Sequence, residues 1–251
     1  MIAVALILTL ASPARADADA SYAAGIAASR AGDPVAAERA FRDALAEGGL
    51  DPAVYHGLGN ALYRQGHLGE AIAAWRRGLV LRPSDGDLAA NLSHAQGETK
   101  DHLDPPPPEL GPFFWQRTLP VTWTLTAAGW LLALAIGLPL LTRLRPALRR
   151  PALRPAAALC GLAGTLLVVS SAVALRQPPT GVIVAPQVAA RSTPGPDGVD
   201  LFLLHEGAEV RLGERADGTT QVILADGRKG WISDTALVSA DPAAPFPDAV
   251  L

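Results

Sequence analysis

Two long apolar stretches without a charged residue, 119–141 and 156–175, interrupt this chain of 251 residues. Each is about as long as the roughly 20 residues that a helix needs to cross the hydrocarbon core of a bilayer. A buried helix of a water-soluble domain is the alternative, but buried helices seldom run so far without a charge. The sequence therefore predicts two membrane-spanning helices that contact the lipid bilayer, with a soluble part before and after the pair.

The segment between the two spans, 142–155, is rich in arginine and contains no acidic residue. Its arginines are Arg143, Arg145, Arg149, Arg150 and Arg154. Short loops with an excess of Lys and Arg stay in the cytoplasm. We therefore expect a membrane hairpin with a cytoplasmic turn, which leaves both flanking parts on the outer side of the membrane.

Residues 1–16 have the pattern of a secretory signal peptide. An apolar run at 1–11 precedes Ala14-Arg15-Ala16, which is a small-x-small cleavage site, and polar residues follow. The usual positive charges at the start are missing, so an uncleaved membrane anchor is the alternative. In both cases the residues that follow are exported.

Residues 17–100 repeat with a period of 34 residues. The offset aligns Gly25 with Gly59 and Phe41 with Trp75. This period and the spacing of small and large residues resemble the tetratricopeptide repeat, an antiparallel pair of helices. The positions that match the repeat and pack its helices are Gly25, Ala37, Phe41, Leu58, Gly59, Ala71, Trp75 and Pro83. With a degenerate first unit and an incomplete third, the array is short, so we expect a partner chain or the membrane to complete it.

The resemblance to tetratricopeptide repeats implies that the inner face of the first helix of each pair binds an extended peptide. The positions that it assigns to this groove are Tyr22, Arg30, His56, Asn60, Tyr63, Arg64, Asn91 and His94. Arg30 and Arg64 could together hold a carboxylate of the partner. A solvated helix face is the alternative for any one of these residues.

A proline-rich linker, 101–118, joins the repeats to the first span, and residues 178–240 then change to short β-rich runs. Turn signals such as Asp217-Gly218 and Asp226-Gly227 separate the runs, which predicts a small all-β barrel before a tail, 241–251. Residues 201–210 and 222–232 resemble the bacterial SH3-like barrel. The resemblance implies Phe202 and Trp231 as ligand contacts, and Trp231 in the barrel core is the alternative.

Sequence motifs of catalysis are missing: we find no phosphate-binding loop, no serine elbow and no zinc-protease helix. We therefore expect no enzyme activity, no cofactor and no metal site. The 21 Lys and Arg residues against 24 Asp and Glu argue against a nucleic-acid partner. A transporter or membrane enzyme would carry ionisable residues within its spans, and these spans have none.

The order of the parts resembles the Bat aerotolerance family, and within it the BatE-like proteins: signal, tetratricopeptide array, two-helix transmembrane hairpin, small SH3-like barrel. The resemblance implies a non-catalytic, multi-domain scaffold of the inner membrane. It implies other membrane proteins as partners, namely Bat-like proteins with von Willebrand A-domains and, indirectly, a MoxR-type ATPase. A cell-envelope protein whose barrel binds peptidoglycan is the second interpretation.

Overall fold

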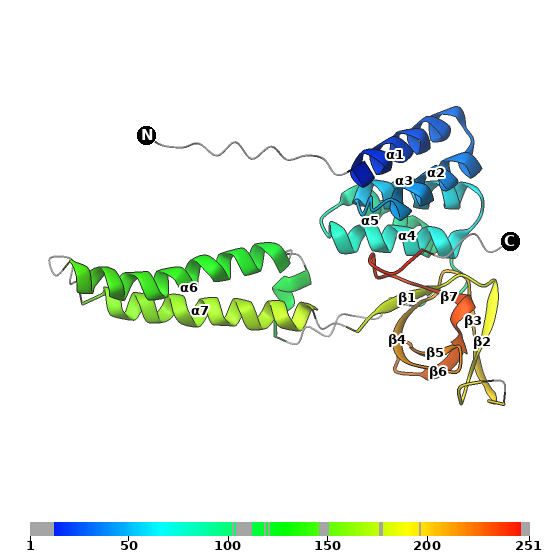
Figure 1. Cartoon of the computed structure of the whole chain (residues 1–251). Coiled ribbons are helices and arrows are strands. Elements are labelled where there is room, and N and C mark those ends of the chain that lie inside the picture. Colours follow the sequence, from blue (N-terminus) through cyan, green and yellow to red (C-terminus); the bar gives the residue numbers. More distant parts are fainter. Residues whose placement is uncertain are drawn as a thin grey trace. The chain divides into compact units, whose positions relative to one another are not determined.

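The structure, a computed structural model, describes residues 13–101, 103, 112–117, 119, 121–145, 151–175, 178–195 and 197–246. Most of the expected signal segment, the proline run of the linker and the centre of the arginine-rich loop lie outside the described residues. The chain forms two compact units. The first combines Met1–Pro106 with Pro179–Leu251, and the second is Pro107–Pro178 (Figure 1). The apolar helices thus interrupt a unit that is discontinuous in sequence.

The amino-terminal part of the first unit is an array of antiparallel helices (Figure 1). They are α1 (Pro13–Ala31), α2 (Pro34–Ala46), α3 (Pro52–Arg64), α4 (Leu68–Leu81) and α5 (Gly86–Glu98). Asp33 and Asp51 cap the amino ends of α2 and α3, and a proline follows each cap. Gly32 and Gly66, which follow α1 and α3, have positive φ angles of 82° and 86° that favour glycine.

Small residues bring the two helices of each pair into close contact. A Cβ on Gly59 of α3 would lie 2.4 Å from Nε1 of Trp75 in α4. In the first pair, a Cβ on Gly25 would lie 2.6 Å from the ring of Phe41. Ala37, Leu58 and Ala71 are fully buried in the same core, whereas Pro83 is exposed just after α4.

The carboxy-terminal part of the first unit is an antiparallel sheet. Its strands are β1 (Thr180–Ile183), β2 (Gln187–Arg191), β3 (Asp200–His205), β4 (Glu209–Ala216), β5 (Thr219–Ile223), β6 (Lys229–Ser233) and β7 (Leu237–Ser239). The strand order is β3-β2-β6-β5-β4-β1-β7. Asp217 and Gly218 link β4 to β5 with φ angles of 52° and 68°, as a two-residue hairpin turn requires.

The sheet covers one side of α4. Val182 and Val238 join the apolar core of the helical array. Arg76 of α4 binds both carboxylate oxygens of Glu209, with Nη2 2.9 Å from Oε1. The backbone N–H of Gly69 donates to Glu206 at 2.8 Å. The chain's own sheet therefore covers one side of the array, and completion of the array by a partner chain or the membrane stays a prediction.

The carboxy-terminal tail is tied to the array by a buried arginine. Arg77, only 1% exposed, donates to the carbonyl of Ala244 at 2.7 Å, and its guanidinium lies 4.8 Å from the ring centroid of Phe246. The hydroxyl of Tyr55 donates to the carbonyl of Pro242 at 3.0 Å. Burial raises the pKa of Tyr55 and lowers the pKa of Arg77. The described part of the tail, 241–246, is thus an integral part of the first unit.

The second unit is a helical hairpin of α6 (Val121–Leu144) and α7 (Leu153–Leu175), preceded by a short 3-10 helix, Phe114–Arg117. By length and composition, α6 and α7 could each cross a membrane. They lie within a few residues of the predicted spans. Thr124 and Ser171 share a hydrogen bond of 2.8 Å between the helices, and Gln116 donates to Ser170 at 2.9 Å.

Candidate functional site

The helices α1 and α3 enclose a hollow of about 520 Å³ on the inner face of the array. Five of the residues that the sequence assigned to a groove line it: Tyr22, His56, Asn60, Tyr63 and Arg64. Ile26 supplies apolar surface in the same hollow, and the ring of Tyr22 packs against the fully buried ring of Phe41, with the two centroids 5.9 Å apart. The hollow therefore combines aromatic surface with hydrogen-bonding side chains.

An amide network links this hollow to α5. The side-chain amide of Asn91 donates to Oδ1 of Asn60 at 2.9 Å, and the same nitrogen lies 2.9 Å from Nε2 of His56. All three residues come from the sequence-derived set. Since α3 and α5 each contribute to the network, the inner face continues from one helix to the next.

Tyr63 and His94 meet at Glu98, a residue that the sequence analysis missed. The hydroxyl of Tyr63 donates to Oε1 of Glu98 at 2.7 Å, and Nε2 of His94 lies 3.3 Å from the same oxygen. The hydrogen bond to Glu98 raises the pKa of Tyr63. The spacing of four residues between His94 and Glu98 on one helix was the signal that could have identified Glu98.

The two arginines expected to hold a carboxylate are both exposed at the carboxyl ends of α1 and α3. Nη1 of Arg64 lies 3.4 Å from the carbonyl oxygen of Ser29. This contact places the Arg64 side chain beside the last turn of α1, which carries Arg30. The positive charges thus lie at one end of the inner face.

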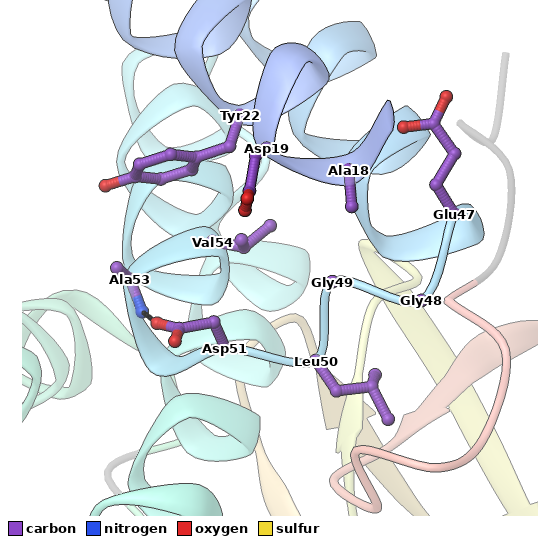
Figure 2. A pocket seen from close by; sticks show the side chains of 10 residues that line it. All are labelled: Ala18, Asp19, Tyr22, Glu47, Gly48, Gly49, Leu50, Asp51, Ala53 and Val54. Atoms are coloured by element: carbon purple, nitrogen blue, oxygen red, sulfur yellow. Dashed lines mark hydrogen bonds between the residues drawn. The ribbon is translucent and has the colours of Figure 1, made fainter. Parts of the chain in front are cut away.

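A second hollow, of about 600 Å³, lies at the opposite end of the same two helices (Figure 2). Its lining residues are Ala18, Asp19, Tyr22, Glu47, Gly48, Gly49, Leu50, Asp51, Ala53 and Val54. Tyr22 and Ala53 also line the first hollow, so the two are neighbours. The sequence analysis did not find this hollow because its wall is the α2–α3 loop, which carries no repeat-defining residue.

The two aromatic residues expected to bind a ligand in the sheet point to opposite faces. Phe202 packs against the core of the sheet, and the guanidinium of Arg228 lies 5.0 Å from its ring centroid. Trp231 is half-buried and stands between the buried residues Gly230 and Ile232, so its side chain is directed away from that core. Phe202 and Trp231 therefore do not share one surface.

Among the residues that the structure describes, no three His, Cys, Asp or Glu side chains are grouped so that they could hold a metal ion. The carboxylate of Asp101 accepts hydrogen bonds from the ring nitrogen Nδ1 of His205 at 2.6 Å and from its backbone N–H at 2.7 Å. Together the two hollows offer aromatic rings, amides and charged groups.

Comparison with known families matches residues 52–85 to the tetratricopeptide repeat. The matched segment contains all of α3 and α4. The chain carries a tetratricopeptide repeat. Comparison with curated proteins and with solved structures gives no match. Tetratricopeptide repeats are protein-interaction modules that are typically non-catalytic, so the array is a scaffold for binding other proteins.

Proposed function

We propose that this protein is a non-catalytic scaffold of the bacterial inner membrane that binds an extended segment of a partner protein along α1, α3 and α5. The observation that carries the proposal is the hollow between α1 and α3, where Tyr22, His56, Asn60, Tyr63 and Arg64 are brought together. These side chains are exposed enough to be reached and are held by neighbours such as Asn91. A peptide bound there would meet aromatic surface and hydrogen-bonding groups along its length.

Contacts across the sequence support a two-pass topology for this scaffold. Arg76, before the hairpin, binds Glu209, after it, so both must lie on the same side of a membrane that α6 and α7 cross. Arg143 and Arg154 lie near the turn of the hairpin, which favours a cytoplasmic turn. The repeats and the sheet are then periplasmic. Reporter fusions at Lys100 and Leu251 test this: activity of a cytoplasm-only reporter at either position would contradict it.

The order of the parts, with its resemblance to BatE-like proteins of the Bat aerotolerance family, supports a more specific proposal. The partners would be other membrane proteins of the same system that carry von Willebrand A-domains, with a MoxR-type ATPase acting through them. The sheet would serve as the SH3-like part of that architecture. Crosslinking in intact membranes followed by mass spectrometry identifies the partner, and recovery of unrelated proteins alone would contradict this assignment.

The groove is tested by charge reversal. We expect the double variant Arg30→Glu, Arg64→Glu to lose most of the crosslinked partner, because both charges lie at one end of the inner face. The matched control is Arg39→Glu, Arg215→Glu, which makes the same change of charge at exposed positions on α2 and β4. Equal partner recovery from the two variants would remove the groove from the proposal.

A second candidate function is binding of peptidoglycan through the sheet. The observation that favours it is Trp231, which points away from the sheet core and so could stack on a sugar ring. Co-sedimentation of the whole protein, in detergent, with purified sacculi tests it. Binding that is lost in Trp231→Ala would support this candidate, whereas no binding by the unaltered protein would exclude it.

A further inference from the structure

We propose that the inner face of the array is a charge-polarised groove that selects a partner segment with a basic side chain about five residues away from an acidic one. The inference rests on the proposed function, because it concerns the same surface, and it specifies the chemistry of the partner. The basic side chain would enter the hollow around Asp19, and the acidic one would meet Arg30 and Arg64.

The hollow around Asp19 has an apolar floor and an acidic rim. Ala18 and Val54 are each 4% exposed and form part of its base, beside the ring of Tyr22. Figure 2 shows the carboxylate of Asp19 directed into the space above Val54. A lysine or arginine has an apolar stem and a charged head, and so matches a pocket of this kind.

Two further carboxylates border this hollow. Glu47 accepts a hydrogen bond from the hydroxyl of Ser21 at 2.8 Å, and Asp51 accepts from the backbone N–H of Ala53 at 2.8 Å. These neutral donors hold both carboxylates in place. Within the described ranges of the chain, no basic side chain lines the hollow, so the charge of its described lining favours a cation.

The opposite end of the groove has the opposite charge. Arg64 lines the hollow between α1 and α3, beside the last turn of α1 where Arg30 lies. Tyr22 and Ala53 border both hollows and connect them. One peptide could therefore lie along α1 and α3 and reach both ends.

The length of α1 sets the spacing. Asp19 and Arg30 are eleven positions apart on this helix, which corresponds to about 16 Å at a rise of about 1.5 Å per residue. An extended peptide advances about 3.3 Å per residue, so about five residues separate its two charged side chains. All lining residues of the acidic hollow lie after Ala16, so a chain cleaved at the expected signal site retains every one of them.

The test is selection from a library. The purified full chain, in lipid nanodiscs, is exposed to random nine-residue peptides with acetylated and amidated ends, and the retained peptides are sequenced. We expect about fivefold to tenfold enrichment of peptides that pair Lys or Arg with Asp or Glu at a spacing of four to six residues.

Charge variants separate the two ends. Asp19→Lys should replace the preference for a basic residue by one for an acidic residue and leave the other preference intact. Arg30→Gln, Arg64→Gln should remove only the acidic preference, and Arg39→Gln serves as the control. Retained peptides without a basic preference, or with an unchanged preference in Asp19→Lys, would overturn the inference while leaving the proposed function in place. If no peptide of the library is retained, both this inference and the proposed function are overturned.

Discussion

Gly25 and Gly59 occupy equivalent positions in the two repeat units, and each lies against an aromatic ring of the following helix. The sequence offset of 34 residues relates Phe41 to Trp75 in the same way, so one packing rule serves both units. The helices approach closely because no Cβ stands between the backbone and the ring. The absence of a Cβ at these two positions therefore determines how closely the two helices of each repeat can pack.

This contact predicts the effect of adding a methyl group. Gly59→Ala should lower the free energy of unfolding by about 1–3 kcal/mol, because the new Cβ would lie 2.4 Å from Nε1 of Trp75. Gly97→Ala, in α5, is the control: a Cβ there meets nothing within 4 Å and should leave stability equal or higher. Denaturant titration measures both. A Gly59→Ala variant as stable as Gly97→Ala would contradict the packing argument.

At the scale of elements, α5 depends on the cap at its amino end. Asp85 accepts a hydrogen bond from the backbone N–H of Leu88 at 3.2 Å, and this bond lowers the pKa of Asp85. A carboxyl whose pKa is lower in the folded state stabilises the fold above its unfolded pKa of about 3.9, and this contribution is lost as the pH falls further. The last helix of the array is therefore sensitive to acid.

We expect Asp85→Ala to lower the free energy of unfolding by about 1 kcal/mol at pH 7, as the loss of an amino-terminal cap usually does. The difference between this variant and the unaltered protein should shrink as the pH falls below about 4, where the carboxyl takes up a proton in the unfolded chain before it does so in the folded protein. Chemical denaturation at several pH values measures it. A difference that stays constant down to pH 2 would show that the charge of Asp85 contributes nothing.

Most elements could be predicted from local patterns. The 34-residue period predicted a helical array, and α3 and α4 match the tetratricopeptide repeat. The short β-rich runs predicted within 178–240 correspond to strands such as β1 and β3, and both Asp-Gly pairs lie in turns of the sheet. The closed barrel stays a prediction. β7 was not predicted, because its three residues, Leu237–Ser239, are too few to show a period.

The residues on the inner face of the array could be predicted from the sequence, whereas the acidic hollow at one end of that face could not. His56, Asn60 and Asn91 were found because the repeat fixes which positions face inward, and the structure links them by hydrogen bonds. The acidic hollow depends on where the α2–α3 loop places Glu47 and Leu50 beside α1. Loop positions follow no period, so the sequence alone carries no signal for that hollow.

At the scale of the molecule, the repeats and the sheet form one compact unit around α4. Sequence patterns could not predict this contact, because Arg76 and Glu209 are charged residues that usually lie in solvent and are 133 positions apart. Arg77 is the clearest case, since it is fully buried yet carries a permanent charge. The expectation of separate domains came from composition, which does not report long-range pairing.

The single unit predicts cooperative unfolding. We would replace residues 107–178 by a Gly/Ser linker of about 15 residues, which spans about 21 Å on average, in a chain that starts at Asp17. Trp75→Phe leaves Trp231 as the one tryptophan, so fluorescence follows the sheet while far-UV circular dichroism follows the helices. The two signals should change at the same temperature.

The controls test the contact between the helical array and the sheet. Glu209→Ala removes the partner of Arg76 and should shift both signals downward together, because the partly buried guanidinium of Arg76 then loses its counter-ion. Residues 17–101 alone should unfold at a lower temperature than the linked protein. Two separate transitions in the linked protein would contradict the single unit.

The discontinuous unit also imposes an order on synthesis. The ribosome completes α4 well before it reaches Glu209, and at about 5–20 residues per second the 133 intervening positions take roughly 7–27 s. The side of α4 that receives Val182 and Val238 is covered by the sheet only after β1 and then β7 have been made. A chain truncated within the hairpin therefore lacks the residues that complete the core on this side of α4.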